Sequence, residues 1–373
     1  MSILACAPSN IALIKYMGKV DSSQNLPANG SLSLTLQSLR TEIELHEVTS
    51  NSGSKTSFRW VSELPRGRNP KESAPLRFSR LVGAPAVPTL NDAGRERYLL
   101  HAERALHLAR TEVLPRLGIE LSLPSLNEWE IRTSNTFPSD SGIASSASSF
   151  AALTLAVVAA QARNPNQFLA CLKNEPALAR ALAALSRQGS GSSCRSFEGP
   201  WVKWEGTEAE KVSSSLPPMT DLVLVVAESR KAVSSSQAHS LVSGSPLWAG
   251  RAQRVTHRMV GLRHALASGD LKVVSRIAWE EMWEMHSLFH TCPEPFTYWE
   301  PETLAILKWI SPRLSDPRPP IVTLDAGPNI HVLVPTETAS DFRQEVENVF
   351  PRVLILQDQQ GLGAEILSWE NIS

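Results

Sequence analysis

The segment Phe137–Phe150, "FPSDSGIASSASSF", changes from a polar loop into the start of an apolar helix. It opens as Pro-Ser-Asp-Ser-Gly and leads into the almost wholly apolar run Phe150–Ala162, which predicts a buried helix. The first N–H groups of a helix have no intrahelical partner, and the helix dipole attracts anions to that end. Small side chains and hydroxyls also let a phosphate approach the backbone closely. The density of serines therefore favours a phosphate-binding loop.

A second interpretation of the same stretch needs no ligand. Serine and aspartate are favoured as ordinary N-caps for local reasons, so the segment is also compatible with a helix cap that binds nothing. A Walker A loop is excluded, because no Gly-Lys-Ser/Thr follows.

The composition limits the class of protein. A chain of 373 residues is long enough for two domains, and its 42% hydrophobic and 20% charged residues are typical of a globular protein. The net charge of −1 offers no basic field for nucleic acid. Four separated cysteines argue against a disulfide framework and against a cysteine zinc site. We expect neither a signal peptide nor a membrane span, and hence a cytosolic protein.

Periodicity predicts strands and helices in both halves of the chain. Alternating or continuous apolar runs predict strands at Thr41–Val48, Glu128–Ser134, Asp221–Ser229 and Val353–Gln357, with a strand-turn-strand unit at Pro320–Pro335. Helices are expected at Gly94–Leu114, Pro176–Leu185, Pro246–Ser268, Leu271–Phe289 and Thr336–Phe350, and after Pro301. The pattern indicates an α+β protein with a boundary near residues 186–220.

A second loop of glycines and serines, "QGSGSSCRSF" (Gln188–Phe197), contains Arg195. A permanently charged guanidinium beside small hydrogen-bond donors suits a phosphate or a carboxylate. The alternative is a flexible linker between domains. A serine-hydrolase elbow is excluded, because neither Ser190 nor Ser192 has glycine on both sides at the required spacing.

Two further motifs each have a functional and a structural interpretation. In "LDAGPNIH", Asp325 stands at a strand end before a Gly-Pro turn, where it is either a turn residue or a positioned base. In "HSLFH", His286 and His290 share one helical face, but no Glu stands at the spacing of a zinc motif, so core packing is favoured.

Taken in order, the motifs resemble those of one enzyme family. "APSNIALIKYMGK", "NLPANGSLSLTL", "SNTFPSDSGIASSASSFAAL", "SRQGSGSSCRS" and "DAGPN" are similar to the successive signatures of diphosphomevalonate decarboxylases. These enzymes belong to the superfamily of galactokinase, homoserine kinase, mevalonate kinase and phosphomevalonate kinase (GHMP). The resemblance implies a two-lobed α+β fold of the GHMP-kinase type. Residues 1–190 would form a nucleotide-phosphate-binding lobe like domain 2 of ribosomal protein S5, and residues 191–373 a ferredoxin-like lobe of the GHMP type, whose last strand could return to the N-terminal lobe.

The resemblance implies ATP-dependent decarboxylation of mevalonate 5-diphosphate to isopentenyl diphosphate, ADP, phosphate and CO₂. The implied catalytic residues are Asp325, Arg195, Asn10 and Lys19. The implied substrate-binding residues are Tyr16, Lys19, Ser190, Ser192 and Arg195. The implied ATP-binding residues are Ser139, Ser141, Gly142, Ala144, Ser145 and Ser146. Mg²⁺ would lie near Ser145 or Ser146 through the phosphates. A homodimer is expected, with neither a nucleic acid nor a membrane as partner.

Three departures from the family pattern bear on the substrate and on the nucleotide. Met17 replaces the usual tryptophan, and Ser236 stands where some bacterial relatives carry an arginine near the diphosphate. Phe58–Glu63 lacks the Trp-Leu-Asn-Gly pattern that often borders the nucleotide. The alternatives are a decarboxylase of mevalonate 5-phosphate, a GHMP-type kinase that releases no CO₂, and a nucleotide-responsive binding protein without turnover.

Overall fold

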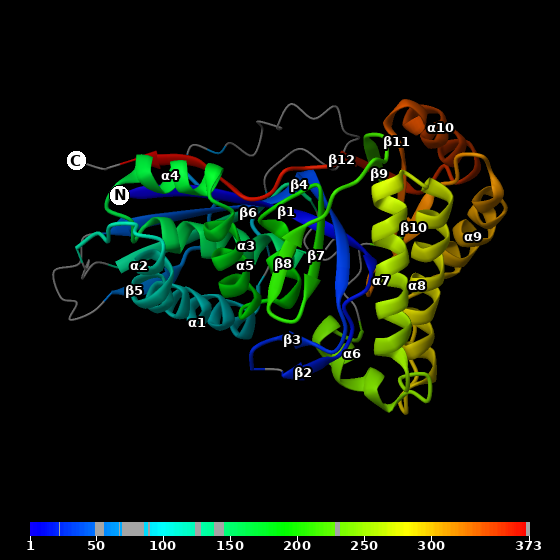
Figure 1. Cartoon of the computed structure of the whole chain (residues 1–373), viewed down its shortest axis with the longest axis horizontal. Coiled ribbons are helices and arrows are strands. Elements are labelled where there is room, and N and C mark those ends of the chain that lie inside the picture. Colours follow the sequence, from blue (N-terminus) through cyan, green and yellow to red (C-terminus); the bar gives the residue numbers. More distant parts are fainter. Residues whose placement is uncertain are drawn as a thin grey trace.

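The computed structural model describes residues 1–21, 23–48, 56–66, 68, 86–88, 90–123, 128–137, 145–227 and 232–370. It contains one large and one small β-sheet with helices packed on both, which confirms the predicted α+β class (Figure 1). The two termini lie at the same end of the molecule, because the last strand pairs with the first (Figure 1).

The larger sheet has the strand order β13-β1-β4-β6-β5, and β7 joins β4 to β8. Its strands are β1 (Ser2–Ile14), β4 (Ser31–Val48), β5 (Ser57–Trp60), β6 (Glu128–Asn135), β7 (Trp201–Glu205), β8 (Glu208–Lys211) and β13 (Glu365–Glu370). All pairs are antiparallel except β5 with β6. The predicted strands at Thr41–Val48 and Glu128–Ser134 are confirmed as parts of β4 and β6.

One apolar helix covers the larger sheet. Helix α3 (Ser145–Ala159) packs on β1 and β4, and α1 and α5 pack on α3 in turn. All of its residues from Ala147 onward are buried, as its apolar sequence predicts. The register of β1 against β4 shifts between Pro8 and Asn10, so the second half of β1 continues with a different alignment.

The smaller sheet is antiparallel, in the order β10-β11-β9-β12. Its strands are β9 (Met219–Val225), β10 (Ile321–Thr323), β11 (Ile330–Pro335) and β12 (Leu354–Gln359). Alternate residues of β9 face opposite sides: Val223 packs with α7 and α8, whereas Leu222 and Leu224 pack with α9 and α10. Burial on both faces explains the continuous apolar run from which a central strand was predicted.

The helices and the hairpin complete the chain. The α-helices are α1 (Asp92–Leu108), α2 (Leu114–Arg116), α3, α4 (Pro165–Asn174), α5 (Pro176–Arg187), α6 (Ser235–Leu241), α7 (Arg251–Ser268), α8 (Leu271–Thr291), α9 (Pro301–Ile310) and α10 (Ala339–Val349). Short helices of other types are η1 (Ala109–Val113), η2 (Gly191–Ser196), η3 (Val242–Gly244), η4 (Ser311–Ser315) and η5 (Thr336–Thr338). The strands β2 (Lys19–Asp21) and β3 (Leu26–Pro27) form a hairpin.

The two sheets share one hydrophobic core cluster. Ile11 and Leu13 of β1 belong to the same cluster as Val255 of α7 and Ile277 of α8. At the other side of this junction, Asp358 of β12 accepts backbone N–H groups of β4. The end of β1 is therefore embedded in the half of the molecule that carries α7 and α8. The division of the chain at residue 190 stays a prediction.

Candidate active site

The end of β1 and the end of β10 meet in a charged pair. Lys15 follows β1 directly, and its Nζ lies 2.6 Å from Oδ1 of Asp325. Thr323, the last residue of β10, donates its hydroxyl to the Ala12 carbonyl at 3.0 Å and so fixes the two strand ends to each other. The Lys15 side chain is 2% exposed and that of Asp325 is 27% exposed. The carboxylate is thus the accessible member of the pair.

Each member of the pair shifts the pKa of the other toward the charged form. Burial lowers the pKa of the Lys15 ammonium, and the Asp325 carboxylate opposes this shift. Burial works to raise the pKa of Asp325, but Lys15, together with His331 and Arg195, outweighs burial, and that pKa lies below its usual value. Asp325 is consequently a carboxylate that is ready to accept a hydrogen bond or a proton.

Arg195 lies in the buried helix η2 and is held entirely by neutral groups. Its Nε donates to Oδ1 of Asn10 and to Oγ of Ser33, both at 3.1 Å, and its Nη1 donates to Oγ of Ser31. The residue is 4% exposed, and within the described residues it forms no ion pair. Burial lowers its pKa, yet a guanidinium keeps its proton in proteins. Arg195 therefore holds a positive charge that no carboxylate neutralises by direct contact.

Asn10 connects Arg195 to the rest of its loop. Its Nδ2 donates to Oγ of Ser196 at 2.9 Å and to the carbonyl of Ser192 at 3.3 Å, while its Oδ1 accepts from Arg195. The sequence predicted a loop or a flexible linker here. The structure instead has a short buried helix, because Asn10 and the serines satisfy its polar groups.

The two serine-rich segments meet in space. The hydroxyls of Ser190 and Ser146 lie 3.3 Å apart, and those of Ser190 and Ser192 lie 3.4 Å apart. Ser145 begins α3, so these hydroxyls gather near the N-terminus of a buried helix. Hydroxyl donors near such an end favour an anion. The predicted residues Ser139, Ser141, Gly142 and Ala144 lie outside the described residues.

Tyr16 borders the second serine segment. Its ring packs against Trp204 and His239, with centroids 4.7 and 4.3 Å away. A Cβ on Gly191 would lie 3.0 Å from both the Tyr16 and the Trp204 rings, so this position has little room for a side chain. The Tyr16 hydroxyl is buried and finds no hydrogen-bond partner in the described part of the chain. It is available to an acceptor such as a phosphate oxygen.

Family models match both halves of the chain. Residues 7–74 and 91–216 match the diphosphomevalonate decarboxylase-like N-terminal domain, and residues 221–366 match the mevalonate 5-diphosphate decarboxylase C-terminal domain. The chain belongs to the diphosphomevalonate decarboxylase family.

Individual relatives cover most of the chain. A diphosphomevalonate decarboxylase of Aspergillus fumigatus is 32% identical over 87% of this chain and 74% of its own length. The crystal structure of a mevalonate diphosphate decarboxylase from Legionella pneumophila is 32% identical, has a TM-score of 0.72 and covers 96% of this chain and 100% of its own. A structure in complex with MVAPP, AMPPCP and magnesium has a TM-score of 0.75, 24% identity and 99% coverage of both chains, which shows the shared fold alone.

The fold is thus of the GHMP-kinase type, as predicted, and Arg195 lies near the Lys15–Asp325 pair. Arg195 is near enough to both members for its charge to lower the pKa of each. Lys19 lies elsewhere, and its Nζ donates to Oδ1 of Asn25 at 2.6 Å. Burial lowers the pKa of Lys19, and the charge of Arg97 lowers it further. The lysine in contact with Asp325 is Lys15, whereas a contact of Lys19 with substrate stays a prediction.

Sequence reasoning missed Lys15. Lys15 stands within the quoted motif "APSNIALIKYMGK", and a single charge in such an apolar run is itself a signal of a buried partner. The departures from the family pattern also have definite positions. Met17 is buried, and Ser236 is exposed in the first turn of α6. On the same helix, His239 accepts the Gly18 N–H through Nδ1 at 2.9 Å.

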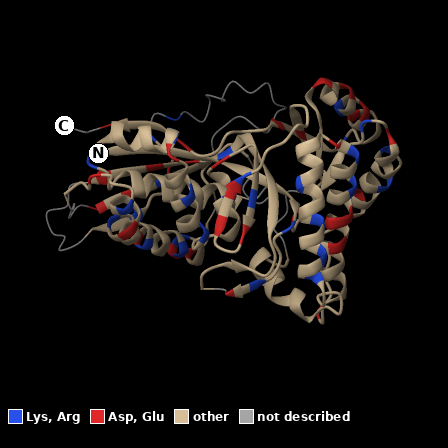
Figure 2. Ribbon diagram, in the orientation of Figure 1, with Lys and Arg blue, Asp and Glu red and all other residues tan. Residues whose placement is uncertain are grey.

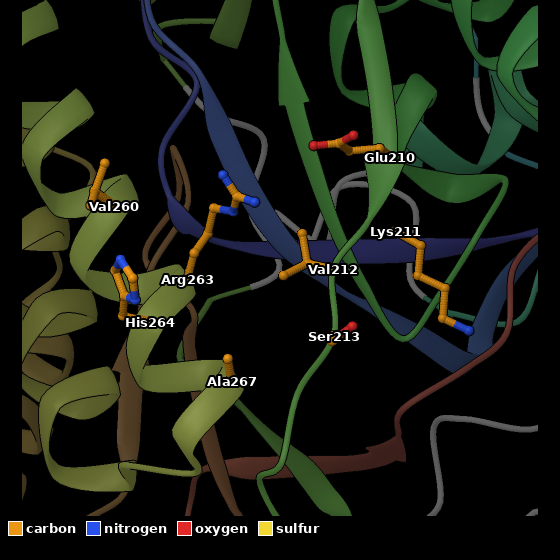
Figure 3. A pocket seen from close by; sticks show the side chains of 8 residues that line it. All are labelled: Glu210, Lys211, Val212, Ser213, Val260, Arg263, His264 and Ala267. Atoms are coloured by element: carbon orange, nitrogen blue, oxygen red, sulfur yellow. The ribbon is translucent and has the colours of Figure 1, made fainter.

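The groove between α7 and the end of β8 is separate from this constellation (Figure 3). Its lining includes none of the residues predicted for the site, and it mixes charges of both signs, with Glu210 facing the groove opposite Arg263 (Figure 3). We assign no ligand to it.

Proposed function

We propose that the protein catalyses the ATP-dependent decarboxylation of mevalonate 5-diphosphate to isopentenyl diphosphate, ADP, phosphate and CO₂. The observation that carries this proposal is an accessible carboxylate, Asp325, paired with buried Lys15 and close to a guanidinium, Arg195, that has only neutral partners. A hydroxy acid with a carboxylate near the reacting alcohol suits this arrangement of one base and one uncompensated cation. Family membership supports the same reaction.

Asp325 would receive the proton of the 3-hydroxyl as the hydroxyl oxygen attacks the γ-phosphorus of ATP, and ADP leaves. The resulting 3-phosphate then departs with the electron pair of the C3–O bond. The electrons of the bond between C2 and the carboxyl carbon form the C2–C3 double bond, and CO₂ is released. Lys15 would keep Asp325 deprotonated before the transfer.

Arg195 would hold the substrate carboxylate by charge-assisted hydrogen bonds until the bond to CO₂ breaks. Its Nη2 has no hydrogen-bond partner among the described residues, whereas Nε and Nη1 are engaged. The diphosphate would bind to Tyr16, Ser190, Ser192 and Lys19. Such binding energy, remote from the reacting carbon, positions the alcohol for transfer.

ATP would bind at the N-terminus of α3, with Ser145 and Ser146 near the phosphates. Within the described residues no cluster of His, Cys, Asp and Glu suits a metal ion. The hydroxyl oxygens of Ser145 and Ser146 are hard donors that fit Mg²⁺ held mainly by phosphate oxygens. Bound there, Mg²⁺ would neutralise the charge of the transferred phosphoryl group. A chain of the same fold has been solved in complex with MVAPP, AMPPCP and magnesium.

Incubation of the pure protein with Mg-ATP and each of mevalonate, its 5-phosphate and its 5-diphosphate tests the proposal. CO₂ and ADP are measured separately. We expect both products, in equal amounts, with the 5-diphosphate. ADP without CO₂ would indicate a kinase, CO₂ from the 5-phosphate a different substrate preference, and neither product a binding protein.

We further propose that the protein is a cytosolic homodimer, as the family resemblance implies. Within the described residues no helix is long and apolar enough to span a membrane. Light scattering of the purified protein at several concentrations gives the mass; a value of one chain, 40.8 kDa, at all concentrations would contradict the dimer.

A further inference from the structure

The backbone of Lys15 is held by charged side chains from two helices, α7 and α8, that lie far from Lys15 in the sequence. Its N–H donates to Oε1 of Glu281 on α8 at 3.1 Å. Its carbonyl accepts from Nδ2 of Asn29 at 2.8 Å and from Nη2 of Arg251 on α7 at 3.5 Å. Lys15 is the first residue after β1, where the strand's own hydrogen bonds end. Side chains, rather than a neighbouring strand, therefore form the hydrogen bonds of the Lys15 N–H and carbonyl.

The two charged groups that hold Lys15 are buried completely. Arg251 is 1% exposed and Glu281 is 0% exposed, and they are joined by a short hydrogen bond from Nη2 to Oε1. The other Glu281 oxygen accepts from Arg251 at 3.1 Å and from Arg258 at 2.8 Å. Figure 2 shows basic and acidic residues along α7 and α8, and this pair is the inner part of that array.

A buried ion pair of this kind is weak evidence for stability. Removing two charges from water costs several kcal/mol per ion, and apolar replacements are often neutral or stabilising. Some other benefit is then expected where such a pair occurs. Here the pair forms hydrogen bonds with the backbone of Lys15, which ties Asp325 to the end of β1.

We propose that Glu281 and Arg251 are positioning residues: both hold the backbone of Lys15 against Asp325, and Glu281 also places a negative charge near the Lys15 ammonium. This inference rests on the proposed function for the consequence in catalysis, but the geometry of Lys15 is independent of it. Neither residue touches the substrate in this proposal.

The charges around Lys15 show why the glutamate matters. Burial lowers the pKa of Lys15, and nearby Arg195 lowers it further; Asp325 and Glu281 raise it. Burial of His286 and, to a smaller extent, the nearby Lys15 ammonium lower the pKa of His286 to about 3, so this ring is neutral. Arg251 contributes a further positive charge at the Lys15 carbonyl. At the Lys15 ammonium, two carboxylates thus oppose the effects of burial and of the Arg195 guanidinium.

The experiment compares Glu281→Gln with a matched control, Glu284→Gln. Both glutamates bind Arg251 and Arg258, but only Glu281 accepts the Lys15 N–H. Glutamine retains an acceptor and the shape while removing the charge. We expect Glu281→Gln to lower kcat by ~10–10²-fold with KM values little changed, since a small displacement of a reacting group has effects of that size.

The dependence of kcat on pH gives a second measurement. If Glu281 had only a structural role, its replacement would not shift the alkaline limb of this pH profile. In Glu281→Gln the Lys15 ammonium should lose its proton at a pH lower by about one unit, the scale of a nearby opposite charge. Glu284→Gln should leave this limb where it is in the parent. Identical profiles for the two variants would overturn the proposal.

Two additions cover loss of folding and failure of the proposed reaction. The double variant Glu281→Leu/Arg251→Met replaces the pair by apolar groups, which usually preserves folding; parent-like kcat in it would overturn the proposal. NMR titration of ¹³Cε-labelled lysines, with Lys15 identified by its absence in Lys15→Met, reports the pKa of Lys15 without turnover. A lower Lys15 pKa in Glu281→Gln alone supports the positioning role even if the parent releases no CO₂.

Discussion

Two buried cations at this site, Arg195 and Lys15, are held in opposite ways. In the part of the chain that the structure describes, Arg195 donates only to an amide and to hydroxyls, whereas Lys15 is bonded through its ammonium to Asp325 and through its backbone to Glu281. A guanidinium stays charged even when buried, but a lysine readily loses its proton there. The lysine therefore needs carboxylates to remain an ammonium, and the arginine does not.

The difference assigns a separate use to each charge. The charge of Lys15 is largely compensated, so Lys15 acts on Asp325 rather than on the substrate. The charge of Arg195 is solvated by neutral dipoles and remains available to an incoming anion. Four substitutions test this contrast.

Asp325→Asn should have the largest effect. It removes the basic carboxylate but keeps the shape, and a positioned general base typically contributes ~10²–10⁴-fold to the rate. Substrate and ATP should bind about as well as in the parent, because other residues hold the anions. Single-turnover release of CO₂ with saturating ligands, beside a binding titration, measures both. Release within tenfold of the parent rate would make Asp325 a turn residue.

Asn10→Asp would give Arg195 a carboxylate partner, as Lys15 has in Asp325. A carboxylate in place of the amide would pair with Arg195 Nε and neutralise it, so the substrate carboxylate would lose its partner. We expect the substrate KM to rise by ~10–10²-fold, the range of one charge-assisted hydrogen bond. Asn10→Ser, which adds no charge, is the control. Equal KM values for the two variants would show that the free charge of Arg195 is unimportant.

Arg195→Lys should introduce a new dependence on pH. A lysine at this position would be buried among Asn10, Ser31 and Ser33, with no carboxylate in contact, so its pKa should fall. As the pH rises through that lowered pKa, the ammonium is lost and substrate binding weakens. The parent should keep its affinity over the same range, because Arg195 stays protonated. Substrate titrations at a series of pH values measure the effect; a flat profile for the variant would contradict the comparison.

Tyr16→Phe should have the smallest effect. The hydroxyl is buried without a partner in the described part of the chain, so its loss should leave the free energy of unfolding unchanged or raise it by about 1 kcal/mol. The KM for mevalonate 5-diphosphate should rise several-fold if this hydroxyl donates to the diphosphate. Denaturant unfolding and steady-state kinetics measure the two quantities. Destabilisation with an unchanged KM would show that the hydroxyl serves the fold.

Much of the fold could be predicted from local signals. Helix α8 begins after Asp270, whose side chain accepts the Val273 N–H. Helix α7 ends at Ser268, and Gly269 after it has a positive φ of 74°, a conformation that glycine adopts without strain. Helix α7 begins at Arg251, later than the predicted Pro246, because Gly250 immediately before it also has a positive φ. Such signals lie within a few residues of the feature that they specify.

The sequence by itself also determined Asp325 and Arg195 as candidates, because their chemistry and their glycine-rich surroundings are local properties. It did not predict β1, whose burial on both faces hides any alternation. Nor could it show that Lys15 reaches Asp325 across 310 positions, or that Glu281 holds Lys15 across 266. Those contacts depend on how the end of β1 packs between α7, α8 and the smaller sheet. The sequence therefore determined which groups could do chemistry, and only the tertiary structure decided which charges are paired and which one stays free, because pairing depends on distance in space.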